Sequence, residues 1–122
     1  VFFQRAALRS RSAGGTDAAL ADLDQAMAIN EAPHYLSLRA ALRHRNGNVE
    51  GAISDLRRLN DLTGTLETHD AITLAEALLK TGDVTGAERS LRLANLGASD
   101  ASDGQKRRIE ALEKELKERA EQ

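Results

Sequence analysis

Histidine is the residue type in this sequence that could most directly bind a metal ion, and there are three: His34, His44 and His69. A zinc site needs three or four ligands, and one helix supplies a second ligand only from a position three or four residues away. No His, Asp or Glu stands three or four residues after His34 or His69. Glu67 and Asp70 are one or two residues from His69, so they should point to other sides of a helix. The pattern predicts surface histidines and no metal site.

Arginines are the second candidate for chemistry, because the pentapeptide Arg-Ala-Ala-Leu-Arg occurs at residues 5–9 and again at 39–43. Four guanidinium groups could together bind an anion. Alternatively, the pentapeptide belongs to a longer unit that the chain repeats, and its arginines are structural. The first reading requires an anion from outside the chain, whereas the second requires carboxylates within it.

No other group of residues matches a catalytic pattern. The sequence has no cysteine, which excludes disulfides, thiolate metal sites and cysteine nucleophiles. Its glycines lie in short turns and do not form the glycine-rich patterns that bind nucleotide phosphates. We therefore expect no catalytic residues, no cofactor and no enzymatic activity.

The composition favours one all-helical domain. Of the 122 residues, 41 % are hydrophobic and 30 % are charged, so the chain can bury a core. Most of the apolar residues are Leu and Ala, which favour helices, and the single proline leaves long stretches free to be helical.

Charge and hydropathy exclude two classes of partner. A net charge of −2 and the absence of tryptophan argue against nucleic-acid binding. No apolar run approaches the roughly 20 residues that span a bilayer, so we expect no membrane insertion and a soluble protein. The compartment is left open, with the cytoplasm favoured. Because the chain starts at Val1 and enters a helical pattern at once, we expect it to be the end of a longer protein.

The chain repeats itself with a period of 33 to 35 residues. The pentapeptide recurs after 34 residues, Gly-Asn-Val-Glu-Gly-Ala at 47–52 recurs as Gly-Asp-Val-Thr-Gly-Ala at 82–87, and Ala-Leu-Ala-Asp-Leu at 19–23 is followed by Ala-Ile-Ser-Asp-Leu at 52–56. Each unit reads as a helix, a tight glycine turn and a second helix with small residues on one stripe. The expected helices are 1–13, 17–30, 33–45, 49–62, 68–80, 84–95 and 103–121.

These units resemble the tetratricopeptide repeat (TPR) family, whose 34-residue repeat has a Gly-Asn/Asp turn and an Ala-x-x-x-Leu-x-x-Ala second helix. The resemblance covers three repeats, residues 1–97, followed by a linker at 98–102 and a capping or coiled-coil helix at 103–122. It implies an all-α, TPR-like α-solenoid of antiparallel helix pairs, with about seven helices.

The repeat allows the anion-site and structural readings of the arginines to be compared. Arg5 and Arg39 occupy the same position in the first helices of their units, and Asp22 and Asp55 occupy the same position in the second helices. In the third unit both charges are absent, and the corresponding residues are Leu74 and Ser90. Because the two charges are present or absent together, we predict an ion pair within each of the first two units.

The last arginine of each pentapeptide, Arg9 or Arg43, has no such partner in this comparison. With Arg11, Arg45 and Lys80 it lies near the end of a first helix, where cations are favoured by the helix dipole. The alternative is a basic edge that meets an acidic partner.

The family resemblance implies a partner-binding groove on the concave face that the first helices of the repeats form. The repeat register assigns this groove to Phe3, Ala7, Arg11, His34, Ser37, Ala41, His44, Arg45, His69, Ile72, Glu76, Leu79 and Lys80. Small and apolar residues with basic ends suit a peptide or helix with apolar anchors and some acidic character.

The last helix has one narrow apolar stripe of Ile109, Leu112 and Leu116. This stripe would either cap the solenoid by packing on the last repeat or form a short coiled coil that makes a homodimer. We therefore expect a non-enzymatic scaffold that binds a partner protein or peptide. The alternative is a structural or oligomerisation arm of a larger, possibly enzymatic, protein that assembles through the last helix.

Overall fold

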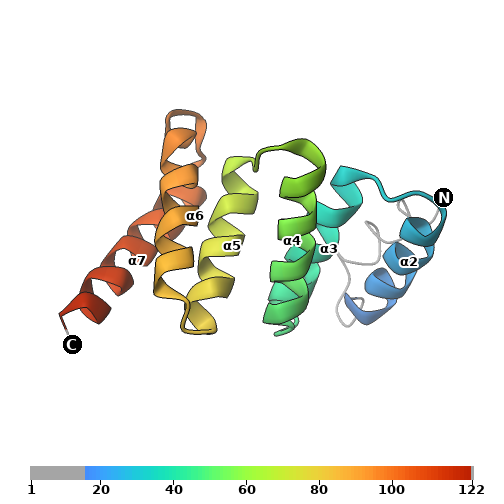
Figure 1. The fold of residues 1–122 in the computed structure, drawn as a ribbon, viewed down its shortest axis with the longest axis horizontal. Coiled ribbons are helices and arrows are strands. Elements are labelled where there is room, and N and C mark those ends of the chain that lie inside the picture. The colour runs from blue at the N-terminus through green and yellow to red at the C-terminus, as the bar shows by residue number, and fades with distance from the viewer. Residues whose placement is uncertain (1–15, 122) are drawn as a thin grey trace. The chain divides into compact units, whose positions relative to one another are not determined.

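The computed structural model describes residues 16–121, and this part of the chain is all-α (Figure 1). Its elements are α2 (Thr16–Ile29), α3 (Pro33–Arg45), α4 (Val49–Thr63), α5 (Thr68–Lys80), α6 (Val84–Leu96), the short 3₁₀ helix η1 (Ala98–Asp100) and α7 (Asp103–Ala120). The all-α prediction is confirmed, and every described α-helix begins and ends within one residue of its predicted range. The helix predicted at 1–13 lies outside the described residues.

The same turn joins α3 to α4 and α5 to α6, and it explains the repeated glycines. Gly47 and Gly82 have φ values of 86° and 87°, a left-handed conformation that other residues rarely adopt. Asn48 then caps α4 by accepting a hydrogen bond from the Gly51 backbone N–H at 3.0 Å. A Cβ atom at Gly51 would lie 2.5 Å from the Asn48 side chain. The second glycine of the motif therefore leaves room for the cap.

The chain forms two compact units that divide after Gly64, and the first contains α2, α3 and α4. The helices α3 and α4 form an antiparallel pair (Figure 1). Their buried apolar residues are Leu36, Ala40 and Leu42 on α3, and Ala52, Ile53, Leu56 and Leu59 on α4. Helix α2 packs against α3, where Ala19, Leu23 and Leu42 form a buried cluster.

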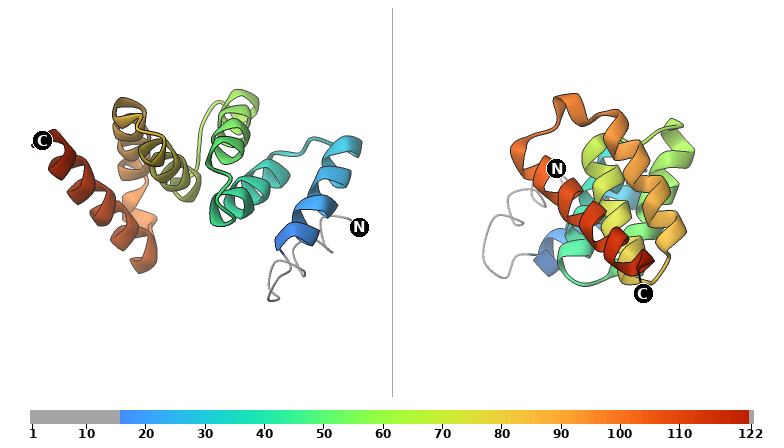
Figure 2. Two further views of the ribbon diagram at one scale, coloured as in Figure 1. Left: turned by 90° about the horizontal axis from the view of Figure 1, so that it is seen from below. Right: turned by 90° about the vertical axis from the view of Figure 1, so that its left-hand side faces the viewer.

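The second unit contains the pair α5/α6, η1 and α7. Ser102 and Gln105 form a capping box at the start of α7, which fixes where the helix begins. The apolar stripe of α7 is buried, and α7 packs against both α5 and α6 (Figure 2). None of the helices in residues 16–121 is both long and apolar enough to cross a membrane.

Candidate binding surface

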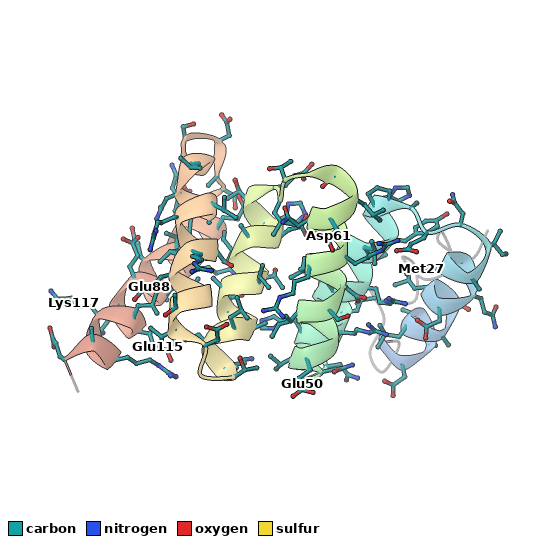
Figure 3. The ribbon with its side chains drawn as sticks, in the orientation of Figure 1. Met27, Glu50, Asp61, Glu88, Glu115 and Lys117 are labelled. Atoms are coloured by element: carbon teal, nitrogen blue, oxygen red, sulfur yellow. The ribbon has the colours of Figure 1, made fainter. Side chains whose placement is uncertain are left out.

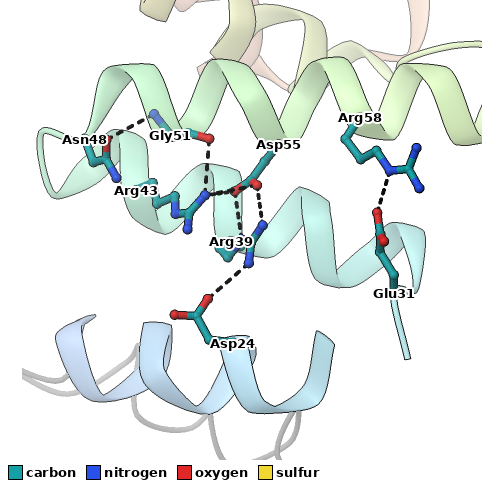
Figure 4. A network of polar contacts seen from close by, with 8 residues as sticks. All are labelled: Asp24, Glu31, Arg39, Arg43, Asn48, Gly51, Asp55 and Arg58. Atoms are coloured by element: carbon teal, nitrogen blue, oxygen red, sulfur yellow. Dashed lines mark hydrogen bonds and ion pairs between the residues drawn. The ribbon is translucent and has the colours of Figure 1, made fainter. Parts of the chain in front are cut away.

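The predicted ion pair between Arg39 and Asp55 is confirmed. The guanidinium of Arg39 donates two hydrogen bonds to the two carboxylate oxygens of Asp55, at 3.0 and 2.6 Å (Figure 4). Asp55 is only 2 % exposed, and its hydrogen bonds raise the pKa of Arg39 further above the ordinary value for arginine. Arg39 also reaches Asp24 on α2, at 3.1 Å. This arginine therefore joins three helices of the first unit and is not free to bind an anion from outside.

Arg43 lies in the last turn of α3, as expected, but the expectation that it lacks a carboxylate partner within its repeat is wrong, because Arg43 also binds Asp55. One of its terminal nitrogens donates to both carboxylate oxygens, at 3.0 and 3.1 Å, and reaches the Gly51 carbonyl at 3.4 Å. The sequence held a signal for this contact, since the third repeat replaces both arginines and the aspartate together, by Leu74, Leu78 and Ser90. Two cations share one buried carboxylate because Arg43 lies one helical turn after Arg39.

In the first repeat only the aspartate of the equivalent network lies within the described residues. Asp22 is 3 % exposed and is therefore buried to the same degree as its counterpart Asp55. Arg5 and Arg9, the partners that the repeat register assigns to it, lie outside the described residues, as do Phe3, Ala7 and Arg11 of the predicted groove.

The groove residues predicted on α3 lie along one side of that helix. His34, Ala41 and Arg45 are exposed, and Ser37 and His44 are half-buried. Their spacing of three, four, three and one residues keeps them on one face of an α-helix. The opposite side of α3 carries the buried Leu36 and Ala40. Helix α3 therefore presents a stripe of small, polar and basic side chains to the solvent.

The groove residues predicted on α5 are placed differently from one another. His69 and Lys80 are exposed, whereas Ile72 and Leu79 are 0 % and 3 % exposed. These two apolar side chains belong to the core. They are among nine buried residues in a helix of thirteen, so α5 is covered on most of its sides. They cannot contact a partner without a change in packing.

Glu76, the remaining predicted groove residue on α5, contacts α7. Arg108 donates hydrogen bonds to both carboxylate oxygens of Glu76 and to the Thr73 hydroxyl, the longer Glu76 bond being 3.2 Å and the Thr73 bond 3.4 Å. The side chain of Glu76 is 24 % exposed. This carboxylate therefore serves to position α7 on α5.

The expectation that Glu67 and Asp70 point away from His69 is wrong. The two imidazole nitrogens of His69 lie 3.5 Å from a Glu67 oxygen and 3.4 Å from an Asp70 oxygen. For Glu67 the helical spacing rule does not apply, because this residue is the N-cap of α5 and has an extended backbone, whereas Asp70 lies inside α5 and meets His69 from the next position. The three residues bring possible ligand atoms within 4.8 Å of one another, the only such group in residues 16–121. Glu67 and His69 are exposed, Asp70 is buried, and we assign no metal ion to the group.

Solved structures of other proteins resemble the chain in fold, among them the following two. The crystal structure of the Sgt2 TPR domain from Aspergillus fumigatus has a TM-score of 0.81 and 22 % sequence identity, covering 99 % of this chain and 80 % of that one. The crystal structure of yeast Tom70 has a TM-score of 0.74 and 16 % identity, covering 98 % of this chain and 25 % of that one. No protein-family model matches the sequence, and no curated protein sequence matches it. The fold is that of tetratricopeptide repeats, as the sequence repeat predicted.

Proposed function

We propose that the chain is a non-enzymatic interaction module, and that the solvent-facing stripe of α3 binds a segment of a partner protein. The observation that carries this proposal is the stripe itself, from His34 through Ala41 to Arg45, which opposes the buried side of the same helix. Small residues such as Ala41 let a partner backbone approach closely, and the exposed Arg45 at the end of the stripe supplies hydrogen-bond donors. The likeness to TPR structures supports the fold on which such a surface is built.

We propose further that the partner segment carries acidic side chains. Arg45 and Lys80 are exposed at the last residues of α3 and α5, and neither forms an ion pair with another residue of the described range 16–121. The helix dipole stabilises a cation at the last residue of a helix, so neither side chain needs an ion-pair partner within the chain. Each can therefore interact with a carboxylate of a partner protein. An acidic segment on the α3 stripe would gain electrostatic attraction at Arg45, mainly as a faster association.

A photo-crosslinking residue placed at Ala41 in the full-length protein tests the binding surface. In extract of its own cells, the crosslinker should give one discrete product, and Arg45→Glu should reduce that product severalfold. Ser54 is exposed on α4 and provides the control position. Products that are identical from Ala41 and Ser54, or that Arg45→Glu leaves unchanged, would contradict binding at the stripe.

The last helix is proposed to cap the repeats. Ile109, Leu112 and Leu116 are 4 %, 4 % and 7 % exposed, and α7 packs on α5 and α6 of the same chain. A coiled-coil dimer would need the same apolar stripe. The burial of this stripe therefore favours the cap over a homodimer formed through the last helix.

A further inference from the structure

Three acidic residues along α2 and the loop after it follow a regular spacing of seven: Asp17, Asp24 and Glu31. Seven residues are close to two helical turns, so Asp17 and Asp24 lie on the same side of α2. Each acid accepts a hydrogen bond from the α3/α4 pair: Asn46 donates to Asp17 at 3.2 Å, Arg39 to Asp24 at 3.1 Å and Arg58 to Glu31 at 2.6 Å. Acidic groups on one side therefore meet neutral or basic donors on the other.

Two of these contacts join α2 to Arg39 of α3 and to Asn46 at its end, and the third joins Glu31, in the loop before α3, to α4. A hollow of about 440 Å³ is lined by Asp24, Met27 and Ala28 from α2 and by Ser54, Asp55 and Arg58 from α4. Figure 4 shows Arg39 reaching from α3 to Asp24 on α2, and the pair between Glu31 and Arg58 farther along. The buried apolar cluster that α2 shares with α3 consists of Ala19, Leu23 and Leu42.

The ion pairs of α2 and of the loop after it are more exposed than the ion pair inside the α3/α4 pair. The side chains of Asp24 and Glu31 are 57 % and 41 % exposed, and that of Arg58 is 53 % exposed, whereas that of Asp55 is 3 % exposed. Salt screens exposed charges much more strongly than buried ones. Raised ionic strength should therefore weaken the contacts of α2 before it weakens those between α3 and α4.

We propose that the ion pairs Asp24–Arg39 and Glu31–Arg58, together with the neutral hydrogen bond from Asn46 to Asp17, form an ionic clasp that loosens as ionic strength rises. Loosening changes the packing of α2 on α3 and α4, while the α3/α4 pair remains formed through its apolar core and the buried Asp55 pair. The packing of α2 on the α3/α4 pair then depends on the salt concentration.

Hydrogen exchange of the full chain in sodium chloride tests the clasp. Between about 0.01 M and about 1 M salt the Debye length falls from about 30 Å to about 3 Å. We expect protection of the α2 amides to fall about three- to tenfold over this range, the size expected for screening two exposed ion pairs, while protection in α4 changes less than about twofold. Unchanged protection in α2, or an equal loss in α2 and α4, would overturn the proposal.

Variants identify the charges responsible. In Asp24→Asn/Glu31→Gln, α2 should be weakly protected already at low salt, with no further loss at high salt. Glu50, at the start of α4 (Figure 3), and Glu113 on α7 are exposed acids outside the clasp, so Glu50→Gln/Glu113→Gln removes the same charge and should behave like the unmodified chain. Equal salt responses in all three proteins would exclude the clasp.

A charge exchange provides the second test. Glu31→Arg/Arg58→Glu reverses the direction of the ion pair and preserves its attraction, so this variant should keep both the low-salt protection of α2 and its loss at high salt. Each single change should lower the low-salt protection, because like charges then face each other. Poor protection in the double variant at both salt concentrations would contradict a clasp based on charge.

Discussion

Arg43 and Asp55 are joined by two hydrogen bonds of 3.0 and 3.1 Å from one guanidinium nitrogen, and the same carboxylate is also held by Arg39. The carboxylate is nearly completely buried, whereas the side chains of the two arginines are 23 % and 17 % exposed. Removal of the carboxylate alone would leave two cations facing each other across a poorly hydrated site.

The third repeat suggests how this network can be replaced. We expect Asp55→Ser alone to lower the free energy of unfolding by about 3 kcal/mol, as for a broken buried ion pair. The triple change Arg39→Leu/Arg43→Leu/Asp55→Ser reproduces the residues of the third repeat and should cost only about 1 kcal/mol. Urea unfolding measures both. A triple variant as unstable as the single variant would show that the network is not replaceable by apolar packing.

Gly51, in the first turn of α4, is expected to affect stability in a way that depends on the Asn48 cap beside it. Alanine at this position would gain up to about 1 kcal/mol of helix propensity but would displace the Asn48 cap, which contributes about 1 kcal/mol. Gly51→Ala should therefore change the stability little in the unmodified chain and stabilise an Asn48→Ala variant. A double-mutant cycle by urea unfolding should give a coupling energy of about 1 kcal/mol. Additive effects would contradict the contact.

The ion pair between Glu31 and Arg58 sets a pH response. The hydrogen bond from Arg58 lowers the pKa of Glu31 below its ordinary value. A carboxyl whose pKa is lowered by folding contributes stability above its unfolded-state pKa, and this contribution is lost as the pH falls through the folded-state pKa. In Arg58→Gln the pKa of Glu31 should rise toward the ordinary value, as carboxyl-carbon NMR titration would show. Arg57→Gln, at an exposed neighbour, is the control and should leave this pKa unchanged.

The cap role of α7 predicts a loss of stability without a change of mass. Leu112 is 4 % exposed, so Leu112→Ala should lower the free energy of unfolding by about 2–4 kcal/mol. Light scattering at a temperature where the variant is folded should give the same molar mass as for the unmodified chain. Glu113→Ala, at the exposed neighbouring position, should affect neither quantity by much. If the molar mass of Leu112→Ala were instead half that of the unmodified chain, the stripe would form a dimer interface.

The helices and their ends could be predicted because local chemistry specifies them. Pro33 stands at the start of α3, where the backbone N–H that proline lacks would have no partner within the helix. Gly47 forms the turn after α3 with a positive φ. Asn48 and Asp83 cap the helices that follow. The pairing of Arg39 with Asp55 was also predictable, because the internal repeat shows which charges are present or absent together. These signals are all encoded within a few residues or copied between repeats.

The candidate surface could be predicted only in part, because exposure depends on what packs against a helix. Ala41 and Leu79 were assigned to one groove by the repeat register, yet Ala41 is exposed and Leu79 is buried. Glu76 was placed in the same groove, but Arg108, 32 residues later, binds it. A register states which side of a helix a residue occupies, and it does not state which other segment covers that side.

The sequence by itself thus determined the repeat, the all-α fold and one ion pair, since helix propensity, capping and a copied unit are local or periodic properties. The tertiary structure decided that Arg43 shares the carboxylate of Asp55, that the apolar stripe of α7 is buried, and that Asp17, Asp24 and Glu31 meet the α3/α4 pair. These contacts depend on distances between segments far apart in the chain. Such distances are set by how whole helices pack together, and each residue contributes only a small part of the packing energy.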